Sequence, residues 1–384
     1  MSYLEKFLNE VDFEWKALGN IATLKRGRVM SKGYLVDNAG GFPVYSSQTV
    51  NSGIIGKIDT FDFDGEYISW TTDGANAGTV FHRTGKFSIT NVCGSIKIND
   101  ESTLNYKFLF YWLSIEAKKH VYSGMGNPKL MSHQVEKIPV PIPCPDNTEK
   151  SLEIQAEIVR ILDAFTVLTT ELTTELTARK KQYNYYRDQL LTRDCATPTS
   201  HTLGEILDMR AGKHIKARDI EASKNFEHQY ICYGGNGSRG YVTNYSHNGD
   251  YALIGRQGAL CGNVKRAKGK FYATEHAVVC TPKEGINIDW AFYMLTFMNL
   301  NQYKSKSAQP GLTVGKIAQL PITVPPIEEQ SRIAAILDKF DFLTNSISDG
   351  LPREIELRQK QYEYYRDLLL SFPRPEKLNS MAEV

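Results

Sequence analysis

The sequence predicts two mixed α/β units in a pseudo-twofold internal repeat, joined by two long antiparallel coiled-coil helices. Three observations carry this prediction. Motifs of the first half of the chain recur in the second half, in the same order and at a nearly fixed offset. In each half, strand-like and turn-like stretches precede a long segment with helical periodicity. The length of 384 residues also exceeds that of a usual single domain.

The repeat is visible in several short matches. Leu18–Ile21 (Leu-Gly-Asn-Ile) recurs as Leu203–Ile206 (Leu-Gly-Glu-Ile), 185 residues further on. The sharpest match aligns residues 179–191 with residues 358–370 at an offset of 179, with ten identities in thirteen positions. The order along the chain is therefore globular unit, helix, globular unit, helix.

The repeat sets the expected domain boundaries. We expect a first globular unit over residues 1–150, a helix over 151–193, a second globular unit over 194–326, a second helix over 327–372 and a tail over 373–384. Each globular unit has short strand-like runs, such as Tyr67–Trp70 and Tyr251–Ile254. Each also has one helix-like aromatic stretch, at Leu104–Ala117 and Asp289–Leu300. Both units are therefore expected to be mixed α/β.

The helical segments space their apolar residues three to four positions apart. The first, Ser151–Thr192, contains no Gly or Pro, and at 1.5 Å per residue it would span roughly 63 Å. The second, Glu328–Ser371, is interrupted at Asp349–Pro352, where we expect a break or kink. An apolar stripe of that length needs a partner helix. The two repeats supply each other, in an antiparallel pair if a pseudo-twofold axis relates the halves.

Missing motifs exclude several functions. We find no phosphate-binding Gly-Lys-Ser/Thr loop, no amino-methyltransferase Asn-Pro-Pro-aromatic motif and no clustered metal ligands, so we expect a non-catalytic chain that binds no metal or cofactor. Gly235–Gly240 has Gly-x-Gly-x-x-Gly spacing, but turn-like and strand-like residues follow where a dinucleotide site needs a helix. The cysteine spacing, and the lack of a signal peptide or a membrane-length apolar run, predict a reduced cytoplasmic protein.

Positive charge is concentrated in the globular units. Lys and Arg outnumber Asp and Glu by 14 to 10 over residues 15–143 and by 15 to 9 over residues 201–326, which gives +4 and +6. The segment 149–193 is neutral, and the segment 327–371 carries −3. Basic globular halves joined by neutral or acidic helices favour a polyanionic partner for the halves alone.

Candidate DNA-binding residues cluster at matching positions of the repeat. Lys and Arg neutralise phosphates, while Arg, Asn, Gln, Ser and Thr reach base edges. In the first unit they are Lys25, Arg26, Arg28, Lys32, Ser46, Ser47, Gln48, Asn51, Thr71, Thr72 and Asn76. In the second they are Lys213, His214, Lys216, Arg218, Asn236, Ser238, Arg239, Arg256, Gln257, Lys265, Arg266 and Lys268. The alternative for any one of them is an ordinary solvated charged surface.

A second candidate surface lies on the helices. Its members are presented twice, as Gln182, Tyr183, Tyr186 and Arg187 and again as Gln361, Tyr362, Tyr365 and Arg366. Two copies of one patch favour two copies of one protein partner. The alternative is that these tyrosines pack the two helices together.

The junctions and helices resemble those of a known family. Leu320–Asp338 is similar to the junction at which a target-recognition domain of a type I restriction-modification specificity subunit enters its long helix. Ile138–Pro143 with Gln155 resembles the same junction, and departs from it by the insertion Cys144–Leu152. Residues 169–176, Thr-Thr-Glu-Leu twice, are similar to the central region of a subgroup that carries tetrapeptide repeats there. The resemblance covers essentially the whole chain.

The resemblance implies a subunit of a restriction system. Each globular unit would read one half of a split, asymmetric double-stranded DNA site, and the helices would dock two methylation subunits. S-adenosylmethionine, ATP and Mg²⁺ would be bound by partner subunits, which methylate adenine and, with restriction subunits, translocate and cleave DNA. No membrane partner is implied. The alternative from another class is a free-standing DNA-binding scaffold without enzyme partners.

The repeated tetrads Thr169–Leu172 and Thr173–Leu176 predict a molecular ruler. One added tetrad lengthens a helix by roughly 6 Å and turns it by about 40° net, whereas one base pair advances DNA by about 3.4 Å and about 34–36°. Rotation matches one base pair, and helix tilt can absorb the surplus length. We expect insertion of one Thr-Thr-Glu-Leu unit to lengthen the unspecified spacer of the DNA site by one base pair, and deletion to shorten it by one. Methylome sequencing checks this, and an unchanged spacer or altered half-site bases would refute the ruler.

Overall fold

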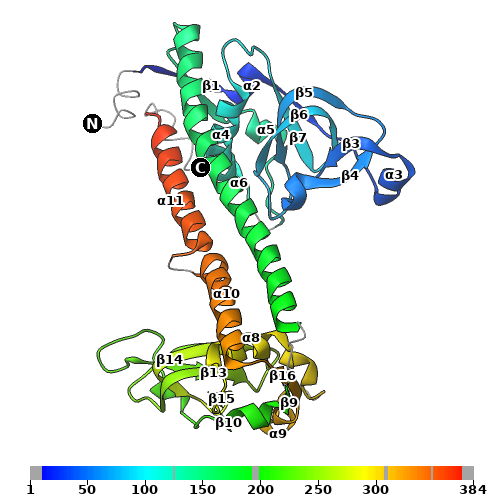
Figure 1. The fold of residues 1–384 in the computed structure, drawn as a ribbon. Coiled ribbons are helices and arrows are strands. Elements are labelled where there is room, and N and C mark those ends of the chain that lie inside the picture. The colour runs from blue at the N-terminus through cyan, green and yellow to red at the C-terminus, as the bar shows by residue number, and fades with distance from the viewer. Residues whose placement is uncertain (1–10, 124–125, 193–198, 307–309, 347–348, 374–384) are drawn as a thin grey trace. The chain divides into compact units, whose positions relative to one another are not determined.

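The computed structural model describes residues 11–123, 126–192, 199–306, 310–346 and 349–373 (Figure 1). The chain forms two compact units. Unit 1 consists of Met1–Thr170 with Leu357–Val384, and unit 2 consists of Glu171–Glu356. The longest helix begins in unit 1 and ends in unit 2, so each unit contains one end of it.

Unit 1 is built on a six-stranded sheet in the order β2-β7-β5-β6-β3-β4, in which β3 and β6 are parallel and the other neighbours antiparallel. A separate antiparallel pair, β1 and β8, leads into and out of it. The strands are β1 (Phe13–Ala17), β2 (Ala22–Arg26), β3 (Ala39–Tyr45), β4 (Ile54–Ile58), β5 (Phe63–Thr71), β6 (Val80–Ile89), β7 (Cys93–Ile98) and β8 (Pro139–Pro143). The short helices are α2 (Leu18–Ile21), α3 (Lys32–Asp37), α4 (Tyr106–Glu116) and α5 (Ser132–Val135).

Unit 2 repeats this topology. Its sheet order, β10-β15-β13-β14-β11-β12, matches that of unit 1 strand for strand, with β11 and β14 as the parallel pair. The strands are β9 (Thr199–Thr202), β10 (Leu207–Ala211), β11 (Tyr230–Gly234), β12 (Gly237–Val242), β13 (His247–Gly255), β14 (Val264–Ala273), β15 (Ala277–Pro282) and β16 (Pro321–Val324). The short helices are α7 (Leu203–Ile206), α8 (Ile288–Phe297) and α9 (Val314–Ala318). The predicted internal repeat of mixed α/β units is confirmed.

One helix packs on the sheet in each unit and supplies several of its large buried side chains. In unit 1, Phe108 and Trp112 of α4 are buried with Trp70 of β5. In unit 2, Trp290 and Tyr293 of α8 are buried in the corresponding core. The aromatic stretches identified in the sequence are thus the helices that cover the two sheets.

The long helices have the predicted extents to within a few residues. Helix α6 runs without interruption over Thr148–Thr192. The second segment is divided into α10 (Ile327–Asn345) and α11 (Leu351–Leu369), so the expected break is confirmed. Pro352 is the second residue of α11, where its missing N–H would lack an intrahelical acceptor in any case.

Within each unit the long helices pair in an antiparallel sense. In unit 1, Phe165 of α6 stacks on Tyr365 of α11, with ring centroids 5.3 Å apart. In unit 2, Tyr186 of α6 stacks on Phe340 of α10 at 5.7 Å. Each pair places an α6 ring against a ring from the other long segment, as the sequence predicted.

A buried glutamine joins each long helical segment to the globular part of the chain that it follows. Gln155 of α6 accepts a hydrogen bond from the N–H of Asn105 (2.8 Å) and donates to the carbonyl of Thr103 (3.0 Å). Gln330 of α10 likewise accepts from the N–H of Asn287 (2.8 Å) and donates to Gly285. Both asparagines cap the helix that covers the sheet. The same clamp therefore fixes both junctions.

An aspartate eight residues after each glutamine makes a second attachment between the long helix and the helix that covers the sheet. In unit 1, Tyr111 donates its hydroxyl to Asp163 at 2.7 Å, and Lys107 forms an ion pair with the same carboxylate. In unit 2, Tyr293 donates to Asp338 at 2.8 Å. The cation there is Arg266, which lies 2.6 Å from Asp338 but comes from β14 rather than from the helix.

The ends of the described chain lie together in unit 1. The Phe13 and Phe372 rings are 4.9 Å apart, and the Trp15 indole donates to the carbonyl of Pro373 at 3.1 Å. Strand β1 is thus held by the segment that follows the last helix, and unit 1 is assembled from both ends of the sequence.

Replacing Gln330 with Ala should destabilise unit 2 by about 3 kcal/mol, because the Asn287 N–H and two carbonyls lose buried hydrogen bonds. Gln302→Ala, at an exposed position of the same unit, should cost under about 0.5 kcal/mol. Amide hydrogen exchange of unit 2 measures both changes. Equal effects of the two substitutions would show that the clamp is not needed.

Candidate DNA interface and partner surface

At one end of the unit 1 sheet, the ends of several strands meet. Asn76 donates to the carbonyl of Ser47 (3.1 Å), and Thr90 donates to the hydroxyl of Ser46 (3.1 Å). Arg26 donates to the carbonyl of Asn91. Gly27 is required here, because a Cβ atom would lie 2.2 Å from the carbonyl oxygen of Ile89. Segments far apart in the sequence therefore present polar groups together.

The predicted DNA-binding residues of unit 1 divide by exposure. Six are exposed: Lys25, Arg26, Arg28, Lys32, Gln48 and Asn51. Ser46, Ser47 and Asn76 are half-buried within the group just described. Thr71 and Thr72 are 1% and 0% exposed, and their hydroxyls donate to Asn76 and Asp73. This corrects the prediction for the two threonines, because side chains closed off from solvent cannot reach a base edge.

The corresponding end of the unit 2 sheet has a different set of side chains. His214 donates to Glu275 (2.9 Å), and Asn263 donates to Asn236 (2.7 Å). Gly212 takes the place of Gly27: a Cβ atom there would lie 2.2 Å from the carbonyl oxygen of Ala273. Burial raises the pKa of Glu275, but hydrogen bonding from His214 and the nearby His276 outweigh it, so the pKa lies below its usual value.

Most predicted DNA-binding residues of unit 2 lie on exposed turns and strand ends. These are Lys213, His214, Lys216, Arg218, Asn236, Ser238, Arg239, Gln257 and Lys265, while Arg256 is half-buried. Lys265, Arg266 and Lys268 belong to strand β14.

Arg266 is a structural residue. Its guanidinium lies 3.2 Å from Asp289 and 2.6 Å from Asp338, over the rings of Phe292 and Tyr293. Lys268, two residues further along β14, lies 3.9 Å from Asp289. Side chains alternate across a strand, so Lys265 points to the opposite face. This corrects the prediction for Arg266, whose charge is neutralised inside unit 2. Lys268 is 58% exposed and stays a candidate DNA-binding residue.

The predicted partner surface has the same geometry in both copies. Arg187 contacts Asp188 at 2.7 Å with its guanidinium 5.7 Å from the Tyr183 ring, and Arg366 repeats this with Asp367 (2.7 Å) and Tyr362 (5.8 Å). Gln182 and Gln361 accept from Arg179 and Arg358 at 2.9 and 3.0 Å. The sequence repeat is therefore also a repeat of side-chain conformation.

The four predicted tyrosines are partly used to pack the helices, as the alternative interpretation held. Tyr183 and Tyr186 both contact Phe340, and Tyr365 contacts Phe165. Of the predicted tyrosines, Tyr186 remains 41% exposed. Tyr185 and Tyr364, which the sequence analysis did not select, project further into solvent, at 63% and 65% exposed. Tyr185 and Tyr364 occupy equivalent positions of the repeat. Their place on the helix face away from the apolar stripe is the sequence signal that could have identified them.

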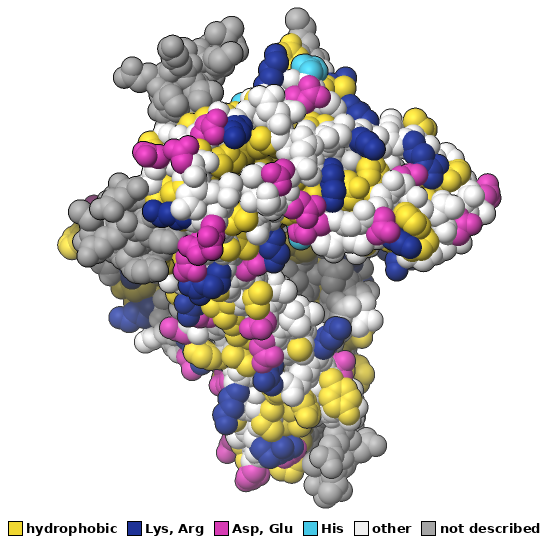
Figure 2. Space-filling view, turned by 90° about the horizontal axis from the view of Figure 1, so that it is seen from above, with side chains coloured by type: hydrophobic (Ala, Val, Ile, Leu, Met, Phe, Trp, Pro, Cys, Tyr) yellow, Lys and Arg dark blue, Asp and Glu magenta, His cyan; other side chains and the backbone are white. Residues whose placement is uncertain are grey.

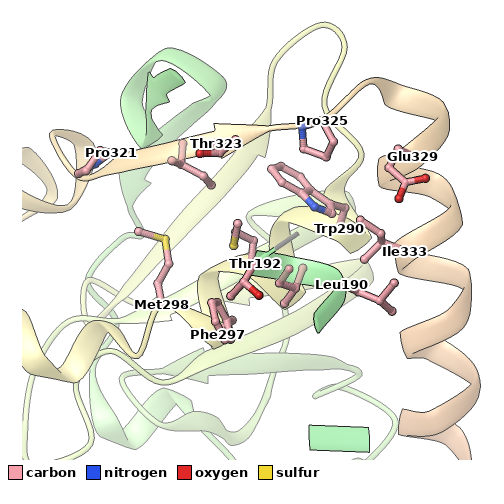
Figure 3. Close-up of a pocket in the computed structure, with 13 residues that line it drawn as sticks. Leu190, Thr192, Trp290, Phe297, Met298, Pro321, Thr323, Pro325, Glu329 and Ile333 are labelled. Atoms are coloured by element: carbon pink, nitrogen blue, oxygen red, sulfur yellow. The ribbon is translucent and has the colours of Figure 1, made fainter. Parts of the chain in front are cut away.

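A pocket of about 660 Å³ lies in unit 2 where α6 ends, lined by Trp290, Met294 and Thr323 among others (Figure 3). Of its described lining residues, only Glu329 is ionisable. In unit 1, Trp15 and Phe372 cover the equivalent site, with their rings 5.6 and 5.7 Å from that of Trp112. Ser200 stands in unit 2 where Trp15 stands in unit 1. The pocket reflects this difference in side-chain size.

Charge on the molecular surface is mixed. On the face shown in Figure 2, basic and acidic side chains of the described residues are interspersed. Within the described ranges, no group of three or more His, Cys, Asp or Glu is placed to hold a metal ion. None of the helices described is long and apolar enough to cross a membrane.

Comparison with known proteins gives one consistent family. The type I restriction modification DNA specificity domain matches residues 10–180 and 199–357. The type I restriction enzyme EcoprrI specificity subunit of Escherichia coli is 48% identical, over 91% of this chain and 92% of its own length. The EcoR124I/EcoR124II specificity subunit of Escherichia coli is 37% identical, over 99% of both chains. The fold is similar to that of the S subunit crystal structure from M. genitalium, with a TM-score of 0.71 at 17% identity, covering 98% of this chain and 100% of that one.

Exposed lysines at the sheet end should carry the salt dependence of DNA binding. Replacing Lys213 with Ala removes one phosphate contact, so the slope of log affinity against log salt concentration should fall in magnitude by about 0.9. Lys283→Ala, at the far end of β15, removes the same charge from unit 2 and should leave the slope unchanged. Binding titrations at several salt concentrations measure both. Equal slopes for the two variants would remove this sheet end from the interface.

Proposed function

Because the chain belongs to the family of type I restriction-modification DNA specificity subunits, we propose that it reads a split, asymmetric DNA site, one half with each unit. One observation carries the proposal. Two sheets with the same strand order present different side chains at equivalent strand ends, where the exposed Asn91 of unit 1 corresponds to Glu275 of unit 2. A common scaffold with different polar groups suits two different short sequences.

The duplicated helix surface supports two identical protein partners. Under this proposal the partners are methylation subunits that bind S-adenosylmethionine and methylate adenine. Restriction subunits join them and use ATP and Mg²⁺ to translocate and cleave DNA. The chain itself contributes DNA binding and assembly in the bacterial cytoplasm, and it performs none of the chemistry.

The position of the tetrads supports the ruler. Thr169–Leu172 spans the division between the two units, inside the uninterrupted α6. The other chain segment that connects the units crosses the division within α11, between Glu356 and Leu357, and is broken in unit 2, because α10 ends at Asn345 and α11 begins at Leu351. α10 and α11 are therefore not one helix. A change in the length of α6 is therefore not opposed by a second continuous helix.

Selection of bound sequences from a randomised DNA duplex library tests the proposed function. The complex of the chain with its co-expressed partner subunits should enrich two short conserved blocks separated by a spacer of fixed length and unspecified sequence. Enrichment of one contiguous block, or of none, would contradict the proposal. Purification of the chain without any accompanying subunit would instead indicate a free-standing DNA-binding scaffold.

Partner stoichiometry should depend on the exposed tyrosines. Tyr185→Ala and Tyr364→Ala should each remove one partner copy from the complex, and the double variant should remove both, because exposed aromatic rings supply much of the binding energy of interfaces. Val167→Ala, another exposed apolar position on α6, should leave two copies bound. Native mass spectrometry counts the subunits. Two copies on the double variant would exclude these tyrosines from the interface.

A further inference from the structure

A polar cluster in unit 2 has buried hydrogen-bonding atoms for which the described residues offer no partner. Oε1 of Glu275 lies 2.9 Å from Nδ1 of His214 and 3.4 Å from Nε2 of His276. In the described part of the chain, Oε2 of Glu275, Nδ1 of His276 and Nε of Arg256 are buried without a hydrogen-bond partner. The N–H of Arg256 donates to the carbonyl of His276 at 2.9 Å, which ties the two strand ends together.

Unsatisfied buried donors and acceptors cost folding free energy. They are rare in folded proteins, so those of Glu275 and His276, two side chains 3.4 Å apart, mark a place where a ligand completes the hydrogen bonds. The cluster is not sealed, because the side chains of Glu275 and His276 are 33% and 36% exposed and that of His214 is 73% exposed. A ligand can therefore approach it from solvent.

The chemistry of the cluster selects the ligand group. A carboxylate repels phosphate, so Glu275 does not serve a backbone contact. In the major groove, the groups that donate to a carboxylate are N4 of cytosine and N6 of adenine, whereas guanine and thymine present the acceptors O6 and O4 there. Arg256, whose N–H donates to the carbonyl of the adjoining His276, would supply a complementary donor for a guanine edge.

The internal repeat identifies these positions as variable. Gly27 and Thr90 of unit 1 recur as Gly212 and Thr274 in unit 2, and they preserve the backbone of the strand ends. At the adjoining positions the side chains differ, since Asn91 and Val92 stand where unit 2 has Glu275 and His276. The scaffold residues recur while the polar residues on it change, as expected for positions that determine which bases are read.

We propose that Glu275 determines one base of the half-site read by unit 2. Its carboxylate accepts a hydrogen bond from the amino group of cytosine or adenine in the major groove, and Arg256 donates to a neighbouring base edge. His214 and His276 are positioning residues that hold the carboxylate. This inference rests on the proposed function. It assigns base specificity to Glu275, which is not among the candidate DNA-binding residues that the sequence predicted.

The test is selection from a randomised duplex library with the full chain and its co-expressed subunits. The parent complex should prefer cytosine or adenine at one position by about tenfold or more over guanine and thymine. Glu275→Gln keeps the size of the side chain, and its amide can also donate to O6 or O4. The variant should therefore accept guanine or thymine at that one position, with every other selected base unchanged.

Glu284→Gln is the matched control, because it removes the same charge from an exposed position beyond the other end of β15. It should select the parent site. If Glu275→Gln also selects the parent site, the inference fails while the proposed function stands. Loss of the whole second half-site together with lower thermal stability would assign Glu275 to folding and overturn the inference too. If the parent complex selects no split site, it is the proposed function that fails.

Discussion

The buried glutamine at the start of each long helix is the contact on which the rest of the structure depends. Gln155 and Gln330 are buried. The side-chain amide of each forms hydrogen bonds with the backbone just before the helix that covers the adjacent sheet. An unpaired amide at that depth would cost more than a neutral hydrogen bond contributes. Each unit is therefore fixed on its helix in one orientation, and the orientation is the same in both copies.

The chain has two tasks, to keep the same scaffold in both units and to give each unit its own chemistry, and different residues carry them. Residues that recur, such as the glutamines and the glycines at the strand ends, keep the scaffold constant. Residues that differ, such as Asn91 and Glu275, provide the chemistry of each unit. The scaffold tolerates a different ion-pair partner at one position. Asp163 pairs with a lysine of α4, whereas Asp338 pairs with an arginine of β14.

The sequence alone predicted the repeat, the long helices and the break between α10 and α11, because identical side chains and helical periodicity are local signals. It did not predict the burial of Thr71 and Thr72 or the internal ion pairs of Arg266, because both depend on which face of a strand meets a distant helix. Glu275 was missed for a related reason. Its partner His214 lies 61 residues away in the sequence and is brought to it only by the order of the strands.

The central claim is that one scaffold occurs twice and that each copy reads DNA independently. A chain in which residues 18–142 replace residues 203–324, on unchanged long helices, tests it directly. Selection from a randomised duplex library should then return the half-site of unit 1 twice, as an inverted repeat across the spacer, as the pseudo-twofold relation predicted from the sequence repeat requires. A folded chimera that still selects the original second half-site, or that selects no defined sequence, would contradict the account.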